Sequence, residues 1–276
     1  MYRMEKINIF GKGFIGSRFC EMIDDTVIND REDYSVKTNN VLYFISTIDN
    51  YNVHTDPFLD IDTNLNVLID VLENCKGKDV TFNFISSWFV YGGVPLPAKE
   101  DAYCDPKGFY SITKRTAEQL LISYCETFGL KYRIIRLANV LGETDNKVSQ
   151  KKNALQYMIN LIKNNKDVNL YNNGNIYRDY IYVDDAVSAI DLILDIGKEN
   201  EIYNVGNGIS IVIRDVIDYA VKKTGSKSNL IDITPSEFHN VVQVKNMVLD
   251  ISKIESLGYV SKFDIHKTID ILTGSY

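Results

Sequence analysis

The sequence predicts an α/β fold in which helices cover both faces of a doubly wound parallel sheet, followed by a small C-terminal part. Two observations support this prediction. Expected strands and helices alternate along the chain, which is the pattern of parallel sheets. The first expected strand, residues 6–10, runs directly into a glycine-rich turn and then a helix. A length of 276 residues suits one large α/β domain with or without an appendage.

The segments expected to build the sheet fill the first half of the chain. Apolar runs indicate strands, and the segments between them indicate helices. The strands are expected at residues 6–10, 26–29, 40–46 and 80–85, and the helices at residues 14–23, 62–74 and 110–128. Ligands bind at the carboxyl ends of the strands in such sheets, and Ser87 is expected at one of these ends.

The turn after the first strand carries three glycines, in the sequence Gly11-Lys12-Gly13-Phe14-Ile15-Gly16. Glycines at this spacing permit a tight turn and the close approach of a pyrophosphate to the backbone, while the helix N-terminus offers N–H groups. Because the turn lies between an expected strand and an expected helix, it predicts a dinucleotide site. The site would include Gly11, Gly13, Phe14, Ile15 and Gly16.

Asp30 and Arg31 follow the second expected strand and are the candidates for contacting the adenosine ribose. They lie closer to the glycines than the ~20 residues that are usual for this contact. Asp30 would favour NAD by binding the ribose hydroxyls, whereas Arg31 could bind the 2′-phosphate of NADP. A solvated turn is the alternative for both residues. The sequence therefore leaves the choice between NAD and NADP open.

Tyr110 and Lys114 begin the long helix expected at residues 110–128. Residues four apart lie one above the other on a helix, so the phenol and the ammonium would share one site. A cation beside a tyrosine stabilises the phenolate and lowers the pKa from its usual value of about 10. The pair therefore predicts a proton donor that can act near neutral pH.

The second half of the chain continues the alternation with shorter elements. A strand is expected at residues 132–142, a last sheet strand with its turn at 202–208, and helices at 153–164, 186–196, 215–224, 250–257 and 262–272. Asp184 and Asp185 precede one of these helices. They are expected to cap it, with the second carboxylate facing water.

Three motifs together resemble the extended short-chain dehydrogenase/reductases, and more narrowly their nucleotide-sugar epimerase/dehydratase/reductase family. They are the glycine turn, the stretch Phe-Ile-Ser-Ser-Trp-Phe-Val-Tyr-Gly at residues 84–92, and Tyr110-Ser-Ile-Thr-Lys114. The resemblance runs from about residue 7 to residue 259. It implies a Rossmann-type NAD(P)-binding domain of residues 1–142 plus about 178–207. Residues of about 143–177 plus 208–276 would then form a small substrate-binding domain.

The resemblance also implies roles for individual residues. Tyr110 would exchange a proton with a sugar hydroxyl or ketone while hydride moves to or from the nicotinamide, and Lys114 would hold the nicotinamide ribose. Ser87 would bind the same substrate oxygen, and it is preferred to Ser86 because the family's Ser or Thr lies four residues before Tyr91.

Three more positions match the family's binding residues. Ser46 lies where family members pass the pyrophosphate. Asn139 stands in an Arg-x-x-Asn-Val-x-Gly pattern whose Asn usually contacts the sugar or the phosphate. Arg178 opens the stretch Arg-Asp-Tyr-Ile-Tyr-Val-Asp-Asp, like the family's second signature. Its guanidinium suits the substrate's nucleotide or diphosphate.

Departures from the family narrow the expected reaction. Extended members usually space their glycines Gly-x-x-Gly-x-x-Gly, and Phe10 stands at the first of these positions. The 4,6-dehydratases carry Asp-Glu where this chain has Trp88 and Phe89. Reductases that also epimerise carbons 3 and 5 place a Cys at the position of Phe89, and Cys104 is only a loose substitute. A redox step at carbon 4 therefore fits the sequence.

The sequence is compatible with two enzymatic reactions at carbon 4 and with a non-enzymatic function. Reduction of a 4-keto-(6-deoxy) nucleotide sugar is preferred, because the short C-terminal part leaves less protein to enclose a sugar that must rotate. The alternative is a NAD-dependent 4-epimerase of the UDP-glucose or UDP-GlcNAc type. The second alternative is a non-catalytic, dinucleotide-sensing binding protein, and the presence of Ser87, Tyr110 and Lys114 argues against it.

Composition excludes several other classes. A net charge of −7, without a cluster of Lys or Arg, argues against a nucleic-acid partner. The four cysteines lack Cys-x-x-Cys spacing and the three histidines are isolated, so neither a disulfide nor a metal site is expected. We expect a cytoplasmic protein, because no apolar stretch approaches the ~18 residues of a membrane span and the N-terminus lacks a secretion signal.

A homodimer is compatible with the sequence. The helices expected at residues 62–74 and 110–128 often form a dimer contact in this family, and Leu120, Leu121 and Tyr124 would supply apolar positions for it.

Overall fold

The computed structural model describes the chain except residues 1–5, 49, 146–147, 150 and 276. Its centre is a six-stranded parallel sheet with the strand order β10-β5-β4-β3-β1-β2. The strands are β1 (Ile7–Phe10), β2 (Thr26–Ile28), β3 (Asn40–Tyr43), β4 (Thr81–Ser87), β5 (Lys131–Leu137) and β10 (Glu201–Val205). The order reverses between β1 and β3, and the predicted doubly wound sheet is confirmed.

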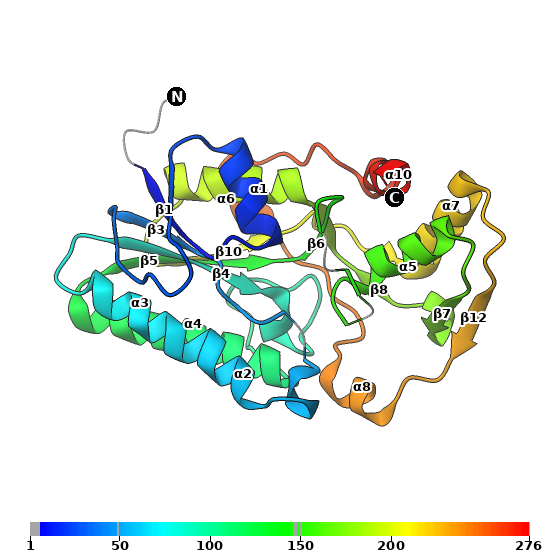
Figure 1. The fold of residues 1–276 in the computed structure, drawn as a ribbon, viewed down its shortest axis with the longest axis horizontal. Helices are drawn as coiled ribbons and strands as arrows, with labels where there is room; N and C mark the ends of the chain where they lie inside the picture. Colours follow the sequence, from blue (N-terminus) through cyan, green and yellow to red (C-terminus); the bar gives the residue numbers. More distant parts are fainter. Residues whose placement is uncertain (1–5, 49, 146–147, 150, 276) are drawn as a thin grey trace.

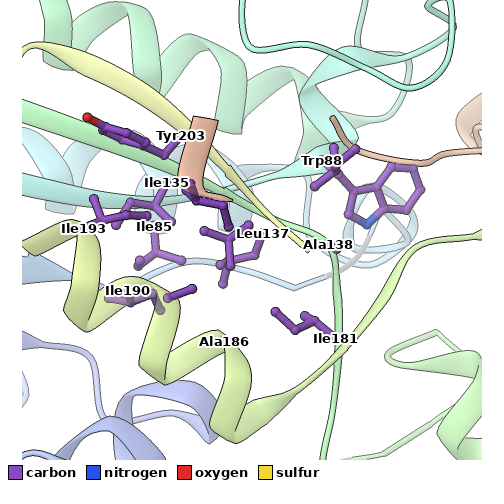
Figure 2. Packing of buried hydrophobic residues seen from close by; sticks show 14 of the residues in the cluster. Ile85, Trp88, Ile135, Leu137, Ala138, Ile181, Ala186, Ile190, Ile193 and Tyr203 are labelled. Atoms are coloured by element: carbon purple, nitrogen blue, oxygen red, sulfur yellow. The ribbon is translucent and has the colours of Figure 1, made fainter. Parts of the chain in front are cut away.

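Helices cover both faces of this sheet, as Figure 1 shows. One face carries α1 (Phe14–Met22) and α6 (Val183–Ile196), and the other carries α3 (Val67–Cys75) and α4 (Phe109–Phe128). Figure 2 shows the first layer, where Ala186, Ile190 and Ile193 of α6 face Ile85, Ile135 and Leu137 of the sheet. Because both faces are covered, most residues of β1, β3, β4 and β5 are buried, including several polar ones.

On the face that α3 and α4 cover, the helical segment that ends with α3 is longer than predicted. The helix expected at residues 62–74 begins earlier, as α2 (Phe58–Ile61), and passes through a π turn over Asp62–Asn66 into α3. Pro57 precedes the first turn, where a proline's fixed φ suits helix entry and its missing N–H costs nothing. The strand expected at residues 132–142 divides at Ala138, because its second part, β6 (Asn139–Leu141), pairs with β9 (Tyr180–Tyr182).

The C-terminal part has a hydrophobic cluster of its own, formed mainly by three helices. These are α5 (Ala154–Lys163), α7 (Ile213–Thr224) and α10 (Ile265–Ser275). Beside them, β7 (Val168–Tyr171) pairs in parallel with β12 (Leu230–Ile233). This cluster supports the proposed small C-terminal domain.

The sequence prediction missed β12 and also α8 (Glu237–Val242), whose N-cap Ser236 accepts a hydrogen bond from the backbone N–H of His239. The helix expected at residues 250–257 is reduced to α9 (Ser252–Glu255). These elements are short, so their hydrophobic period is too brief to identify them.

Asp184 and Asp185 differ from the prediction. The helix α6 begins at Val183, so both acids lie in its first turn rather than at its cap. Asp184 makes a bidentate ion pair with Arg18 of α1, at 2.6 and 2.9 Å. The prediction that the second carboxylate faces water is wrong, because Asp185 is buried and accepts the backbone N–H groups of residues 262 and 263.

Asp179 joins three segments that are distant in the sequence. Its carboxylate accepts hydrogen bonds from the backbone N–H groups of Asn207, Gly208 and Leu249, at 2.9, 3.0 and 3.3 Å. Burial raises the pKa of Asp179 to about 6. A Cβ at Gly206 would lie 2.5 Å from an Asp179 oxygen, so a side chain there would displace this carboxylate from its hydrogen bonds.

The expected dimer surface is only partly available. Leu120 is 37% exposed, but Leu121 is fully buried in the cluster between the sheet and α3, and so cannot contact a second chain. The Tyr124 hydroxyl donates to Glu73 at 2.7 Å. A homodimer stays a prediction. Among the described residues, no helix combines the length and apolar character needed to cross a membrane.

Replacing Asp179 with alanine should destabilise the fold. Three backbone N–H groups would lose their acceptor, and we expect the free energy of unfolding to fall by about 3 kcal/mol or more. Urea denaturation measures the change, with the exposed Asp101→Ala as a control that should stay within about 0.5 kcal/mol of wild type. Equal midpoints for the two variants would contradict the role assigned to Asp179.

Candidate active site

A cavity of about 1430 Å³ lies at the carboxyl ends of four neighbouring strands of the sheet. The segments that follow β1, β3, β4 and β5 line one part of it, and residues of α5, β7 and α8 line the other. This is the place where parallel α/β sheets bind their ligands. The cavity therefore contains the candidate site.

The glycine turn has the shape that a dinucleotide site needs. Gly11 has a φ of +96°, and a Cβ there would lie 2.9 Å from the backbone nitrogen of Ile45. A Cβ at Gly16 would lie 2.2 Å from the carbonyl oxygen of Gly11. Gly13 has open space instead, and it precedes α1 without capping the helix through a side chain. The N–H groups at the start of α1 are therefore accessible to a phosphate.

The remaining residues predicted to bind the dinucleotide divide into two groups. Gly13, Phe14, Ile15, Gly16 and Ser46 line the cavity, together with Tyr110 and Lys114, whereas Gly11 does not line it and contributes to the shape of the turn. Asp30 and Arg31 do not line the cavity, and both side chains are exposed. Their contact with an adenosine ribose stays a prediction.

Sequence reasoning missed Asn64, which comes from the π turn between α2 and α3. Its side-chain oxygen accepts the backbone N–H of Thr47 at 2.9 Å, and its amide donates to the Thr113 hydroxyl at 2.9 Å. Asn64 thus ties the loop after β3 to the helix that carries Tyr110 and Lys114. A π turn often marks a functional site, but no pattern in the local sequence predicts a π turn.

Ser87, Tyr110 and Lys114 all line the same cavity. Ser87 ends β4, and its hydroxyl oxygen accepts the backbone N–H of Phe89 at 3.3 Å, so its proton can be donated to a ligand. Tyr110 lies in the first turn of α4, and its ring meets the ring of Phe89 edge to face, with centroids 6.1 Å apart. The predicted trio is therefore brought together from β4 and α4.

Lys114 is almost completely buried, with 2% of its surface exposed. Its Nζ donates to the carbonyl oxygen of Ile85 at 2.7 Å and lies 4.2 Å from the centre of the Phe84 ring. Burial lowers the pKa of Lys114 to about 7, although the charge of Glu118 acts in the opposite direction. The amine is thus held at a fixed place beside the cavity.

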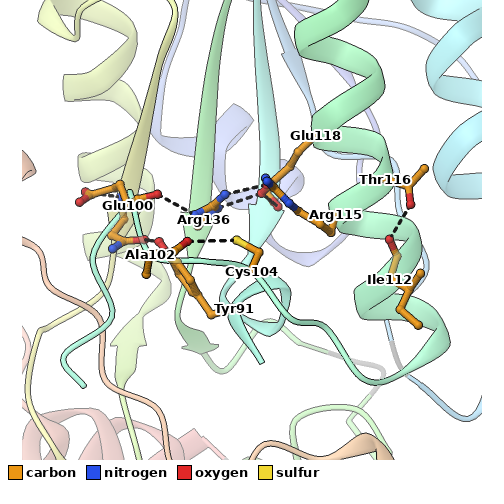
Figure 3. Close-up of polar contacts among 11 residues, drawn as sticks. Tyr91, Glu100, Ala102, Cys104, Ile112, Arg115, Thr116, Glu118 and Arg136 are labelled. Atoms are coloured by element: carbon orange, nitrogen blue, oxygen red, sulfur yellow. Dashed lines mark hydrogen bonds and ion pairs between the residues drawn. The ribbon is translucent and has the colours of Figure 1, made fainter. Parts of the chain in front are cut away.

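Glu118, one turn beyond Lys114 on α4, is the centre of a buried polar cluster. Figure 3 shows its carboxylate between Arg136 of β5 and Arg115 of α4. Arg136 binds both of its oxygens, at 3.0 and 2.8 Å, and Ser86 donates to it at 2.5 Å. Burial raises the pKa of Glu118, but the hydrogen bonds and charge of Arg136 outweigh this and lower it. Because the Ser86 hydroxyl is engaged here, Ser87 is the better candidate for binding a ligand.

The predicted substrate residues also line the cavity. The Asn139 side chain donates to the carbonyl oxygen of Asp179 at 3.0 Å. Arg178 is buried and lies over the Trp88 ring, 5.3 Å from its centre. Its guanidinium donates to the carbonyl oxygens of Tyr177, Val244 and Lys245.

Burial lowers the pKa of Arg178 to about 10. In the part of the chain that the structure describes, no carboxylate forms an ion pair with it. Because its described partners are neutral, this guanidinium is a positive group that suits an anionic ligand.

At the rim of the cavity, α8 touches the segment between β3 and α2 (Figure 1). His239 Nδ1 lies 3.1 Å from the Tyr51 hydroxyl, and the ring of Phe238 packs beside those of Tyr51 and His54. Burial and the charge of Arg178 lower the pKa of His239. Among the described residues, no three His, Cys, Asp or Glu side chains gather where they could hold a metal ion.

The lowered pKa of Lys114 predicts how stability depends on pH in the absence of a cofactor. Between pH 7 and the ordinary pKa of 10.5, the unfolded chain holds this proton while the folded protein does not. The free energy of unfolding should therefore rise with pH in this window, by up to about 1.4 kcal/mol per pH unit relative to Lys114→Met. Urea denaturation at several pH values tests this, and parallel curves for the two proteins would refute it.

Comparison with known proteins gives consistent results. A putative UDP-glucose 4-epimerase from Methanocaldococcus jannaschii is 28% identical over 232 residues, which cover 83% of this chain and 74% of that protein. The UDP-glucose 4-epimerase of Thermotoga maritima, solved with UDP-glucose, has a TM-score of 0.86 at 21% identity, and the match covers 98% of each chain. RMD from Pseudomonas aeruginosa, solved with NADPH, has a TM-score of 0.84 at 18% identity, with 99% of this chain and 98% of that chain covered.

At these identities the two solved structures establish the fold alone. The family model is more specific, because it matches residues 35–206, which include β3 to β10 and with them Ser87, Tyr110, Lys114, Asn139 and Arg178. The chain belongs to the NAD dependent epimerase/dehydratase family of enzymes.

Proposed function

We propose that the protein is an NAD(P)-dependent oxidoreductase that reduces the 4-keto group of a nucleotide-linked 4-keto-(6-deoxy) sugar. The observation that carries this proposal is that Ser87, Tyr110 and Lys114 line the same cavity as the glycine turn. A proton donor, a cation and a dinucleotide site are the parts that carbonyl reduction needs.

Each residue of the trio has one task in this proposal. The bound nicotinamide supplies the hydride. Tyr110 gives its hydroxyl proton to the oxygen on carbon 4, and Ser87 donates a hydrogen bond to the same oxygen. Lys114, fixed by the carbonyl of Ile85, binds the nicotinamide ribose and, in its protonated form, stabilises the phenolate that Tyr110 becomes.

Binding of the cofactor rests on the residues around the glycine turn. The start of α1 and Ser46 bind the pyrophosphate, for which Gly13 leaves open space. The family is described as NAD dependent, and the Pseudomonas aeruginosa protein was solved with NADPH, so both cofactors stay in the proposal. Asp30 and Arg31 are the residues proposed to decide between them.

The substrate's diphosphate is assigned to Arg178, because a buried guanidinium with neutral partners retains its attraction for an anion. Asn139, on the same wall, is assigned to the phosphate or the sugar. The nucleotide-sugar assignment is supported by the Thermotoga maritima relative, which was solved with UDP-glucose. Dehydration is disfavoured because Trp88 and Phe89 offer no carboxylate beside Ser87.

A NAD-dependent 4-epimerase is the second candidate. The names of the Methanocaldococcus jannaschii and Thermotoga maritima relatives favour it. In this reaction Tyr110 first takes the proton of the hydroxyl on carbon 4 and later returns one. The hydride of carbon 4 would pass to NAD and return to the opposite face of the same carbon, so that the cofactor ends in its starting form. The same trio serves both candidates, and they differ in whether the cofactor is consumed.

The proposed reductase should consume reduced cofactor. Purified protein given NADPH or NADH and 4-keto-6-deoxy nucleotide sugars should oxidise the cofactor steadily, which the absorbance of the reduced nicotinamide measures. Tyr110→Phe should lower kcat by about 10²- to 10⁴-fold, because the proton donor is lost. Interconversion of UDP-sugars without net oxidation would replace the reductase by the epimerase. Biological activity that survives Tyr110→Phe would favour a binding protein instead.

The proposal assigns different roles to the two adjacent serines. Ser87→Ala should lower kcat/KM by about 10²-fold or more, because a donor to the developing alkoxide is removed. Ser86→Ala is the matched control and should retain most of the activity, since Ser86 donates to Glu118. Steady-state kinetics of both variants test the assignment, and a greater loss for Ser86→Ala would reverse it.

A further inference from the structure

Trp88 and Phe89 form an aromatic wall along the cavity, directly after Ser87. Their rings are stacked, with centroids 4.0 Å apart and planes inclined by 25°. Trp88 is almost buried and belongs to the main hydrophobic cluster of the sheet, at one end of which Figure 2 shows it. Phe89 is only partly buried and packs against this cluster. Phe89 is thus the member of the pair that has surface left to offer a ligand.

The wall connects the two functional ends of the cavity. At one end, the ring of Phe89 meets the ring of Tyr110, the proposed proton donor, edge to face. At the other end, Trp88 lies under the guanidinium of Arg178, the proposed anchor of the diphosphate. A sugar that reaches from the diphosphate to Tyr110 must therefore lie along Trp88 and Phe89.

The chemistry of the wall restricts the sugar. Phe89 presents only ring carbon, so a hydroxyl or carboxylate placed against it would lose water without gaining a hydrogen bond. A methyl group in the same place would gain contact area instead. Carbon 4 of a hexose has two neighbours, and carbon 5 is the one that carries a carbon substituent rather than a hydroxyl. The substituent on carbon 5 is therefore the group that suits the wall.

We propose that the Trp88–Phe89 wall selects nucleotide sugars whose substituent on carbon 5 is a methyl group, over those that carry a hydroxymethyl or a carboxylate there. This inference rests on the proposed function and deepens it, because it makes the 6-deoxy feature a requirement set by named residues. Phe89 is the specificity-determining residue, and Trp88 holds it in place by stacking.

Binding of a sugar to this protein can be measured by tryptophan fluorescence, without catalytic turnover. Trp88 is its one tryptophan and lines the cavity, so intrinsic fluorescence reports what binds beside it. Titration with UDP-6-deoxyglucose, UDP-glucose and UDP-glucuronate, and with the matching dTDP-sugars, gives a Kd for each. We expect wild type to bind the 6-deoxy sugar roughly 10-fold or more tightly than the other two, a ratio typical of a misplaced hydroxyl or methyl.

Two variants of Phe89 test the residue itself. Phe89→Ser removes the apolar surface and adds a hydroxyl, and it should bring the three Kd values to within about 3-fold of one another. Phe89→Leu is the matched control, which keeps an apolar side chain and should keep the preference. Thermal unfolding of both variants checks that they fold, and the comparison of sugars on wild type needs no variant at all.

The outcomes separate this inference from the proposed function. A preference that Phe89→Ser abolishes and Phe89→Leu retains supports the inference. Equal affinities of wild type for the three sugars, or a preference that survives Phe89→Ser, would overturn it and leave the nucleotide-sugar proposal standing. Failure of every nucleotide sugar to bind would overturn both.

Discussion

The buried ion pair between Glu118 and Arg136 holds together the part of the fold on which the site depends. Glu118 belongs to α4, Arg136 to β5, and the Ser86 that donates to Glu118 to β4. Two central strands and one helix are thus fixed to a single carboxylate. A helix that slid or rotated would leave an unpaired charge inside the protein, which typically costs several kcal/mol. Lys114 lies one turn before Glu118, and Ser87 lies one residue after Ser86, so the ion pair fixes the relative positions of both.

The cavity combines two kinds of wall with different tasks. Backbone N–H groups at the start of α1, the buried amine of Lys114 and the guanidinium of Arg178 provide positive character where phosphates and a developing oxyanion would lie. Trp88 and Phe89 provide apolar surface between these positions. Polar groups of this kind orient a ligand, whereas an apolar wall acts mainly by rejecting groups that it cannot bind by hydrogen bonds. In the proposed function, catalysis and substrate choice therefore depend on different residues of one cavity.

Sequence alone predicted the features that depend on local patterns. The glycine turn is defined by spacing next to a strand, and the presence of both Tyr110 and Lys114 at one cavity follows from their spacing on one helix. Features that depend on contacts between distant segments were missed. Asn64 acts from a π turn that no residue pattern marks, and Asp185 is buried because residues 261–263 return to cover it. Leu121 was predicted to lie at a dimer contact, but it is buried in the core. The sequence did not show this, because the packing of α4 against the sheet decides which side of the helix faces the core.

The glycine turn has a consequence for the thermodynamics of cofactor binding. Gly11 is packed closely against Ile45, and Gly16 against the carbonyl of Gly11, so neither position has room for a Cβ. This close packing gives the turn its shape without any ligand. A loop that is ordered before binding loses little conformational entropy when a pyrophosphate arrives, whereas a mobile loop loses about 1–2 kcal/mol for each residue that becomes fixed. The tight turn thus reduces the entropic cost of binding and leaves more of the contact energy to appear as affinity.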